Sequence, residues 1–301
     1  MRARGARDGE LKMKRLPKRF LATLLFAPSG IALFFACAQV YADPALPRHA
    51  PYPGGVAVVK LGGTDSQVLD VMFGGKRVLT FRNAEGLLAL VGLPLDMQPG
   101  RQTLQIRTQA GSLTLAYEAA FEVKPKSYPA QHLKISPRFM RPSDDELKRI
   151  EREQIEIDHA KNHWSDAAPA SLMLDLPASG RLSARFGLRR VLNGQEGSPH
   201  AGLDVAIGAG TPLRAAAAGR VIATGDYFYS GKSVFVDHGQ GFITLYIHMS
   251  RIDVKESDSL ERGAVLGLSG ATGRVTGPHL HWAVLLNGAY VDPELFLKAG
   301  R

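Results

Sequence analysis

The sequence predicts a mainly β protein with two β-rich domains joined by one charged helix. Short apolar runs alternate with glycine or proline turns over residues 43–125, and the same pattern returns over residues 176–301. Runs of this length and spacing are typical of small sandwiches and antiparallel sheets. Only the stretch around 144–163 is long, charged and periodic enough for a helix. With 32 glycines, 18 prolines and a hydrophobic content of 45%, the chain is expected to be folded and rich in turns.

The charge distribution argues against a nucleic-acid partner. Residues 1–42 hold eight Lys and Arg and two acidic residues, so they supply +6 of the formal charge of +9 and leave +3 for the rest. A bias of this size is too small to predict binding to nucleic acid. The one cysteine, Cys37, lies in the same segment, so neither domain is expected to have a disulfide or thiolate chemistry.

Residues 1–42 have the features of an export signal. A basic stretch ends at Arg19, an apolar run covers residues 20–38, and Val40-Tyr41-Ala42 fits cleavage after Ala42. Met13 is an alternative start. The competing interpretation is an uncleaved segment that anchors the chain in a membrane, because the apolar run approaches the length of a span. Both interpretations place the rest of the chain outside the cytoplasm.

Residues 43–125 are predicted to form a small β-sandwich-like accessory domain. No cluster of titratable residues occurs in it, so a structural or adaptor role is expected. Turn signals such as Gly62-Gly63 and Pro99-Gly100 separate its expected strands. These strands are Val56 to Leu61, Val68 to Phe73, Val78 to Phe81, Thr103 to Thr108 and Leu113 to Tyr117.

Residues 126–175 are predicted to be a linker that contains the helix. Ser143 and Glu146 have the spacing of a capping box, which places the start of the helix at about residue 144. His159 and His163 lie four residues apart near its end, a spacing that can hold zinc. Ala160 stands where a zinc peptidase helix would need a glutamate base, so these histidines are expected to be solvated rather than ligands.

In the predicted domain 176–301, the first motif with candidate site residues is His200-Ala201-Gly202-Leu203-Asp204. In an extended chain, His200 and Asp204 share one face while Leu203 points into the core, and Gly202 lets the backbone pass close to a metal or substrate. Imidazole and carboxylate groups are both zinc ligands. Together with His281 they would make three ligands and leave a fourth position for water, as in catalytic zinc sites.

The run Gly277 to Val284 supplies a second pair of histidines. On a strand, His279 and His281 lie on one face, while Leu280, Trp282 and Val284 anchor the other face in a core.

The run Phe242 to His248 alternates in the same way and should present Thr244, Tyr246 and His248 on a polar face. A non-ligand imidazole there could accept a proton or stabilise an oxyanion. His238 precedes a turn and is expected to have a structural or second-layer role.

Four motifs of this domain resemble the M23 family of zinc metallopeptidases, the lysostaphin and LytM-type cell-wall endopeptidases. They are R-F-G-L-R at 185–189, H-A-G-L-D at 200–204, T-L-Y-I-H-M-S at 244–250 and G-P-H-L-H-W at 277–282. The resemblance covers residues 176–298. It implies an antiparallel β-sheet fold with an open groove and hydrolysis of peptide bonds in peptidoglycan. The segment Tyr229 to Lys232 departs from the family pattern, so the groove is not predictable there.

The resemblance also implies roles for five residues. His200, Asp204 and His281 match the ligands of one Zn²⁺ ion, and His248 and His279 match the two catalytic histidines that are not ligands. Which of these two is the base stays open. The resemblance further implies a D-alanyl-diaminopimelate bond as the substrate and the periplasm as the location, with inner-membrane association if residues 1–42 are retained.

Two alternatives belong to other classes of protein. One is a non-catalytic module that binds the wall or activates another cell-wall hydrolase, although all five residues of the site are present. The other is a lipoyl-type carrier domain, because the runs Thr211 to Val221 and Leu260 to Gly267 resemble its hairpins. A regulatory protein partner is left open.

Overall fold

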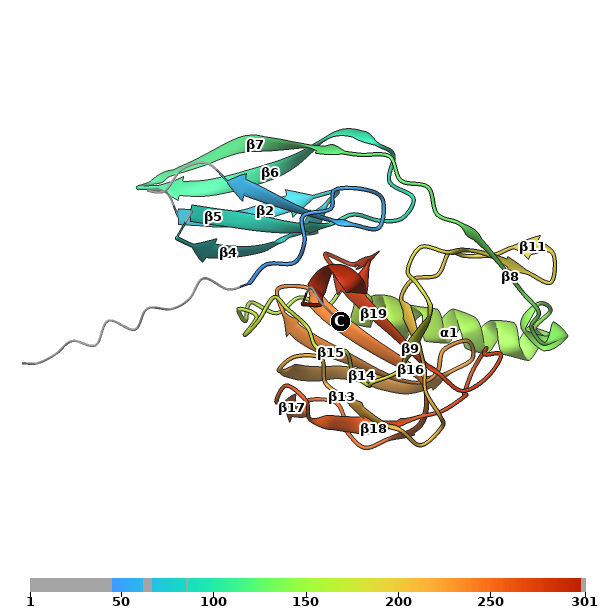
Figure 1. Ribbon diagram of the computed structural model, residues 1–301. Coiled ribbons are helices and arrows are strands. Elements are labelled where there is room, and N and C mark those ends of the chain that lie inside the picture. Colours follow the sequence, from blue (N-terminus) through green and yellow to red (C-terminus); the bar gives the residue numbers. More distant parts are fainter. Residues whose placement is uncertain (1–44, 62–66, 85, 299–301) are drawn as a thin grey trace, which may run out of the picture. The chain divides into compact units, whose positions relative to one another are not determined.

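The computed structural model in Figure 1 describes residues 45–61, 67–84 and 86–298. The predicted export or anchor segment, 1–42, lies outside these residues. Within the described part of the chain, we find no helix with the length and apolar character needed to cross a membrane. One long helix, α1, stands among many strands, which confirms the predicted mainly β class.

The first domain is a sandwich of two antiparallel sheets, as predicted. Its core takes side chains from both sheets, with Ala57 and Val91 from one and Val71 and Leu104 from the other. The first sheet has the order β1-β5-β4, and the second has the order β3-β2-β6-β7. The strands are β1 Val56–Leu61, β2 Gln67–Phe73, β3 Lys76–Arg77, β4 Leu79–Asn83, β5 Gly86–Gly92, β6 Gly100–Ala110 and β7 Leu113–Val123.

Strand β5 was missing from the predicted strands. It pairs with both β1 and β4, so it is the central strand of its sheet. Residues from Leu88 to Gly92 are all buried, so the run has no alternation of apolar and polar residues. Strands buried on both faces lack the period of two by which a strand is recognised in a sequence.

The linker holds a helix and an additional strand. Helix α1 spans Asp144–Lys161, and the predicted capping box between Ser143 and Glu146 is formed at its start. Before it come the strand β8, Ala130–Leu133, and the short 3-10 helix η1, Pro137–Phe139. The strand was not predicted. It pairs in parallel with β10 of the C-terminal domain, so this part of the linker belongs to the wall of that domain.

A ten-stranded antiparallel sheet forms the C-terminal domain, as predicted. Its main path has the order β17-β14-β15-β16-β19-β12-β9, with β13, β18 and β20 attached. Its strands are β9 Arg181–Ala184, β12 Leu203–Ala206, β13 Pro212–Arg214, β14 Gly219–Tyr227, β15 Gly231–Gly239, β16 Phe242–Ile252, β17 Ser259–Leu260, β18 Val265–Ser269, β19 Leu280–Leu286 and β20 Ala289–Val291. A small sheet joins β8 to β10 Arg189–Leu192 and β11 Gln195–Glu196, and the 3-10 helix η2 is Pro293–Phe296.

The central strands of this sheet are covered on both faces. Trp282, Val284 and Tyr246 belong to the main core, whereas Ala283 and Ile243 pack on the opposite side in the cluster that also contains Ala160 of α1. The two clusters give the strands β16 and β19 fixed positions, and the candidate site takes His248 from β16 and His281 from β19.

The prediction of a polar face on β16 was wrong. Thr244 and Tyr246 are fully buried, and the Tyr246 hydroxyl accepts a hydrogen bond from the backbone N–H of Ala216 at 2.8 Å. Both faces of this strand are therefore core. A buried hydroxyl with a partner is compatible with a core, so polar residue types do not by themselves mark a solvent face.

Candidate metal centre

Asp204 and His281 are brought together by strand pairing. They are direct cross-strand partners in the antiparallel pair β12 and β19, flanked by the pairs Leu203 with Trp282 and Val205 with Leu280. All four flanking residues are fully buried in the main core. The apolar faces predicted for β12 and β19 are therefore confirmed. The packing of these four residues holds the backbone that carries the two candidate ligands.

His200 reaches the same point from the turn before β12. It is completely buried, and its Nδ1 donates a hydrogen bond to the carbonyl of Arg185 at 2.7 Å. Gly202 makes this turn possible, because a Cβ there would lie 2.5 Å from Nε2 of His281. The predicted close passage of the backbone at Gly202 is thus present in the structure.

Three lone-pair atoms converge between these residues. Nε2 of His200 lies 2.9 Å from Oδ1 of Asp204 and 2.9 Å from Nδ1 of His281. Nδ1 of His281 lies 2.7 Å from the same carboxylate oxygen. In the described part of the chain, these three residues form the group of His, Cys, Asp and Glu side chains able to hold a metal ion.

The positions of the hydrogens in this group leave room for a cation between the three residues. Because Nδ1 of His200 carries the proton that Arg185 accepts, Nε2 of a neutral His200 is an acceptor and faces a carboxylate, which is also an acceptor. His281 can supply one proton at most to the three atoms. Lone pairs are therefore left without a donor at a buried point, and a metal ion would satisfy them.

The surroundings of Asp204 and His281 also favour the protonation states that bind a metal ion. Burial would raise the pKa of Asp204, but the close approach of the His200 and His281 rings, at 2.9 and 2.7 Å from its carboxylate, outweighs burial and holds that pKa far below the ordinary range. Burial lowers the pKa of His281 to about 4, against the opposing effect of Asp204. Near neutral pH the site thus has an ionised carboxylate and a neutral imidazole, the forms that bind metals.

His248 enters the site at an irregularity of β16. The pairing of β15 with β16 shifts register between Lys232 and Val234, opposite this residue, and His248 has a φ of 63°. A left-handed conformation is costly for a residue with a Cβ, and such strain concentrates at functional sites. The bulge, rather than the predicted alternation, directs the ring toward the site.

His248 also has a defined tautomer. Its Nδ1 donates a hydrogen bond to the carbonyl of Thr272 at 2.8 Å, which leaves Nε2 as the acceptor. Burial lowers its pKa to about 3, and the neighbouring His281 and His279 act in the same direction. The ring is therefore neutral and available to accept a hydrogen bond or a proton.

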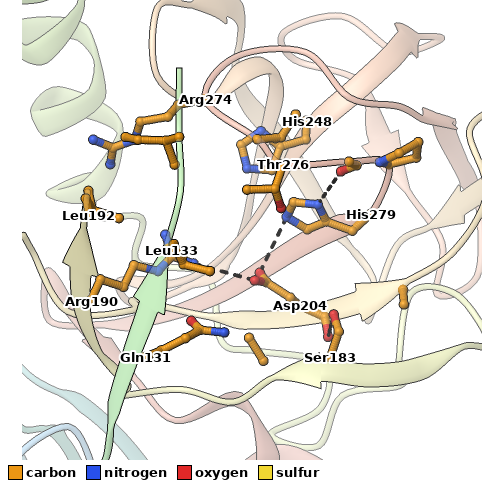
Figure 2. Close-up of a pocket in the computed structure, with 16 residues that line it drawn as sticks. Gln131, Leu133, Ser183, Arg190, Leu192, Asp204, His248, Arg274, Thr276 and His279 are labelled. Atoms are coloured by element: carbon orange, nitrogen blue, oxygen red, sulfur yellow. Dashed lines mark hydrogen bonds and ion pairs between the residues drawn. The ribbon is translucent and has the colours of Figure 1, made fainter. Parts of the chain in front are cut away.

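His279 stands beside His248 at the start of β19. The two ring centroids are 4.9 Å apart. Nδ1 of His279 donates to the carbonyl of Gly277 at 2.8 Å, and Nε2 lies 3.8 Å from Oδ1 of Asp204. Its side chain is 17% exposed, so it is the more exposed member of the pair. In both histidines Nδ1 is bonded to a backbone carbonyl, so Nε2 is the nitrogen left for the site, and Figure 2 shows the two rings side by side near Asp204.

A cavity of about 260 Å³ opens on this centre. It is lined by Asp204, His248 and His279, by the loop that precedes His279, and by β8 and β10. Two arginines in the lining, Arg190 and Arg274, were missed at the sequence level. Figure 2 shows Arg190 and His279 reaching Asp204 from different sides. The signal that could have found them is their position, since Arg190 closely follows the R-F-G-L-R motif and Arg274 shortly precedes the H-L-H motif.

The remaining histidines lie apart from this centre. Nε2 of His163 is 3.6 Å from Oδ2 of Asp237, and neither His159 nor His163 belongs to the metal-capable group found among the described residues. His238 is buried, and its Nδ1 donates to the carbonyl of Ala218 at 2.8 Å. This contact lies within the packed sheet and fits the expected structural role.

The segment Tyr229 to Lys232, which departs from the family pattern, supports the site through backbone hydrogen bonds. The carbonyl of Ser230 accepts a hydrogen bond from the backbone N–H of His248 at 2.9 Å. The carbonyl of Tyr229 accepts one from the backbone N–H of Arg274 at 2.8 Å. Tyr229 to Lys232 therefore holds two site residues in place, although its own sequence is unusual.

An antiparallel sheet that carries a His-Asp-His cluster and two further histidines defines a candidate metal-dependent hydrolase. Comparison with known proteins agrees. The profile of "Peptidase family M23" matches residues 198–293, and that of "Peptidase family M23 N-terminal domain" matches residues 49–126. A crystal structure of a protein described as a peptidase M23 from Pseudomonas aeruginosa is 45% identical, with a TM-score of 0.69 over 82% of this chain and 95% of that chain. The chain belongs to peptidase family M23.

Curated relatives match over a shorter region. Peptidoglycan DD-endopeptidase ShyA of Vibrio cholerae is 41% identical over 113 residues, which are 37% of this chain and 26% of that protein. DD-carboxypeptidase/endopeptidase Mpg of Neisseria meningitidis is 39% identical over 113 residues, which are 38% of this chain and 26% of that protein. The matched segment thus spans about a quarter of the length of these relatives.

Proposed function

We propose that this protein is a zinc-dependent endopeptidase that hydrolyses peptide cross-links of peptidoglycan outside the cytoplasm. One observation carries the proposal. Nε2 of His200, Oδ1 of Asp204 and Nδ1 of His281 converge at a buried point, and two more histidines present Nε2 to the same cavity. Family membership and the names of the relatives support the substrate class.

His200, Asp204 and His281 would hold the metal ion. Two imidazoles and one carboxylate are a ligand set that zinc accepts, and three protein ligands are typical of a catalytic site. When bound, zinc supplies Lewis-acid activation of a water molecule and of the scissile carbonyl. The Nδ1 hydrogen bond to Arg185 keeps His200 in the tautomer that this role requires.

His248 and His279 would handle the proton. Each has its Nδ1 hydrogen pinned to a backbone carbonyl, so Nε2 is the atom that takes up the proton from the attacking water. Once protonated there, the ring can donate to the developing oxyanion or pass the proton to the leaving amine. His279 is the more exposed of the two, which gives it the shorter route for proton exchange with solvent.

The proposed bond is the D-alanyl-diaminopimelate cross-link. The relatives named DD-endopeptidase and DD-carboxypeptidase/endopeptidase support a bond between two D-centres. A periplasmic location follows from the interpretation of residues 1–42 as an export signal, and an uncleaved segment would add association with the inner membrane.

Mass spectrometry of peptidoglycan sacculi after digestion by the full-length mature protein tests this function. We expect cross-linked muropeptides to be converted to monomers, with about one zinc ion per chain in the active preparation. Intact cross-links together with one zinc per chain would instead favour the alternative, a non-catalytic wall-binding module or an activator of another hydrolase. The presence of all five site residues argues against that alternative.

A further inference from the structure

The cavity next to the metal centre has an unbalanced charge. Of the residues that line it, Arg190 and Arg274 are the only Arg or Lys, and Asp204 is the only acid. Asp204 is also the proposed metal ligand, so its charge is shared with a divalent cation when the site is loaded. Two guanidinium groups then remain without an anion of their own.

Arg190 is held close to the reacting centre. It lies on β10, paired with Gln131 of β8, and its side chain is 22% exposed. Its Nη2 is 3.5 Å from Oδ2 of Asp204, a long contact for an ion pair. Its Nε and the Oε1 atom of Gln131 are both buried without a hydrogen-bond partner among the described residues. The guanidinium is thus poorly satisfied by the protein itself.

Arg274 has no acidic partner among the described residues. Its guanidinium carbon lies 4.6 Å from the centroid of the Tyr229 ring, and Tyr229 also anchors its backbone N–H. Arg190 and Arg274 are both partly buried and line the same cavity, so the two cations face one space. Half-buried guanidinium groups that repel each other would gain a favourable contact from an anion placed between them.

We propose that Arg190 and Arg274 form a carboxylate subsite that binds the free α-carboxylate of the residue on the amine side of the scissile bond. This inference rests on the proposed peptidoglycan endopeptidase function. In a D-alanyl-diaminopimelate cross-link, the carbon bonded to the scissile nitrogen also bears a carboxylate. That carboxylate is the one nearest to the reacting bond, which matches the nearness of Arg190 to the metal ligand Asp204. Planar guanidinium groups are well shaped to bind carboxylates.

The subsite would define a substrate class. It selects bonds whose amine-side residue carries a free α-carboxylate, in a cross-link or at the end of an uncross-linked stem peptide. An internal glycine bridge has no such group at this position, and neither does a cross-link whose diaminopimelate carboxylate is amidated.

The test compares two cross-linked muropeptide dimers that differ only at this carboxylate, which is free in one and amidated in the other. For the zinc-loaded full-length protein, we expect kcat/KM to be about 10- to 100-fold higher for the free carboxylate, the size of one or two charge-assisted hydrogen bonds. In Arg274→Gln this ratio should fall to near 1. The matched control is Arg189→Gln, because Arg189 is 58% exposed and pairs with Glu196 at 2.9 Å.

The outcomes separate the subsite from the function. Cleavage of both dimers at equal rates by the unmodified protein would overturn the subsite and leave the endopeptidase function standing. Cleavage of neither dimer would overturn the function and the subsite with it. A loss of discrimination in Arg189→Gln equal to that in Arg274→Gln would also overturn the subsite.

Arg190 needs a second measurement because it contacts a metal ligand. We expect Arg190→Gln to keep its zinc and to lose discrimination between the two dimers. If this variant lost zinc while Arg274→Gln kept it, Arg190 would be a positioning residue for Asp204 and the assignment of Arg190 to the carboxylate would be wrong.

Discussion

At the scale of single residues, the candidate site is organised by hydrogen bonds from Nδ1 of histidines to backbone carbonyls. His200, His248 and His279 each donate in this way, to Arg185, Thr272 and Gly277 respectively. Each bond fixes which nitrogen keeps its lone pair, so all three rings present Nε2 to the centre. His281 differs because it presents Nδ1. Histidines that look alike in the sequence therefore present different ring nitrogens to the site.

Because His281 is assigned to the metal and His248 to proton transfer, their alanine variants should lose different properties. His281→Ala removes one of three converging atoms and should lose both zinc and activity. His248→Ala leaves those atoms in place, so it should keep zinc and lose turnover by about 10²- to 10⁴-fold, the usual contribution of a positioned acid or base. Metal analysis of the purified variants and rates on muropeptides check this. If His248→Ala lost zinc as readily as His281→Ala, the assignment would be wrong.

Gly202 predicts a steric effect on the metal centre. A Cβ at this position would lie 2.5 Å from Nε2 of His281 and 2.5 Å from the carbonyl of Trp282, so Gly202→Ala must displace the ring or the strand. We expect weaker zinc binding, measured by competition with a chelator. Gly208→Ala is the control, because nothing lies within 4 Å of a Cβ there. Unchanged zinc affinity in Gly202→Ala would contradict the close packing.

At the scale of elements, the pair of strands β12 and β19 is the support of the site. Leu203 and Val205 of β12 face Trp282 and Leu280 of β19 across the pair, and all four lie in the core. The side chains of Asp204 and His281 alternate to the other face. A site built on packed strands is held more precisely than one on loops alone.

Trp282→Ala tests this support. Trp282 is completely buried, and its removal should lower the free energy of unfolding by about 3–5 kcal/mol because a large cavity remains. Activity should fall as well, since His281 is its neighbour in sequence and moves with the strand. Urea unfolding and zinc content are the measurements. A variant with reduced stability but full zinc affinity and turnover would show that the strand does not position the imidazole.

The elements also show which patterns can be recognised in the sequence. Helix α1 and its capping box were predicted, because capping depends on residues three positions apart. Strands β5 and β8 were not predicted. Strand β5 is an apolar run without alternation. Strand β8 is a short segment that pairs, among the described strands, with β10, about sixty residues away.

At the scale of the whole molecule, buried histidines couple stability to pH. Burial lowers the pKa of His238 to about 4, whereas an unfolded histidine has a pKa near 6.5. Above pH 6.5 the ring is neutral in both states and its packing is fully retained. As the pH falls from 6.5 toward 4, only the unfolded chain gains the proton, so stability decreases. Below about pH 4 both states are protonated and the loss ends.

We therefore expect the free energy of unfolding to fall by about 2–3 kcal/mol between pH 7.5 and pH 4.5 on account of His238 alone. His238→Gln should be less stable at pH 7.5 but should lack this part of the pH dependence. His132→Gln, which changes an exposed histidine of β8, should keep it. Urea unfolding at the two pH values provides the measurement, and an unchanged pH dependence in His238→Gln would contradict the buried, neutral ring.

Patterns of residues along the chain predict the mainly β class, the start of α1, the faces of β12 and β19, and the five candidate site residues. These follow from local relations: alternation along a strand, capping over three residues, and motifs of a few residues. Only the tertiary structure decided how His248 enters the site, because its left-handed backbone arises where β16 slips against β15. It also decided that Arg190, Arg274 and Asp204 share one cavity. Such neighbours meet through strand pairing and loop packing between distant segments, and spacing along the chain does not record those contacts.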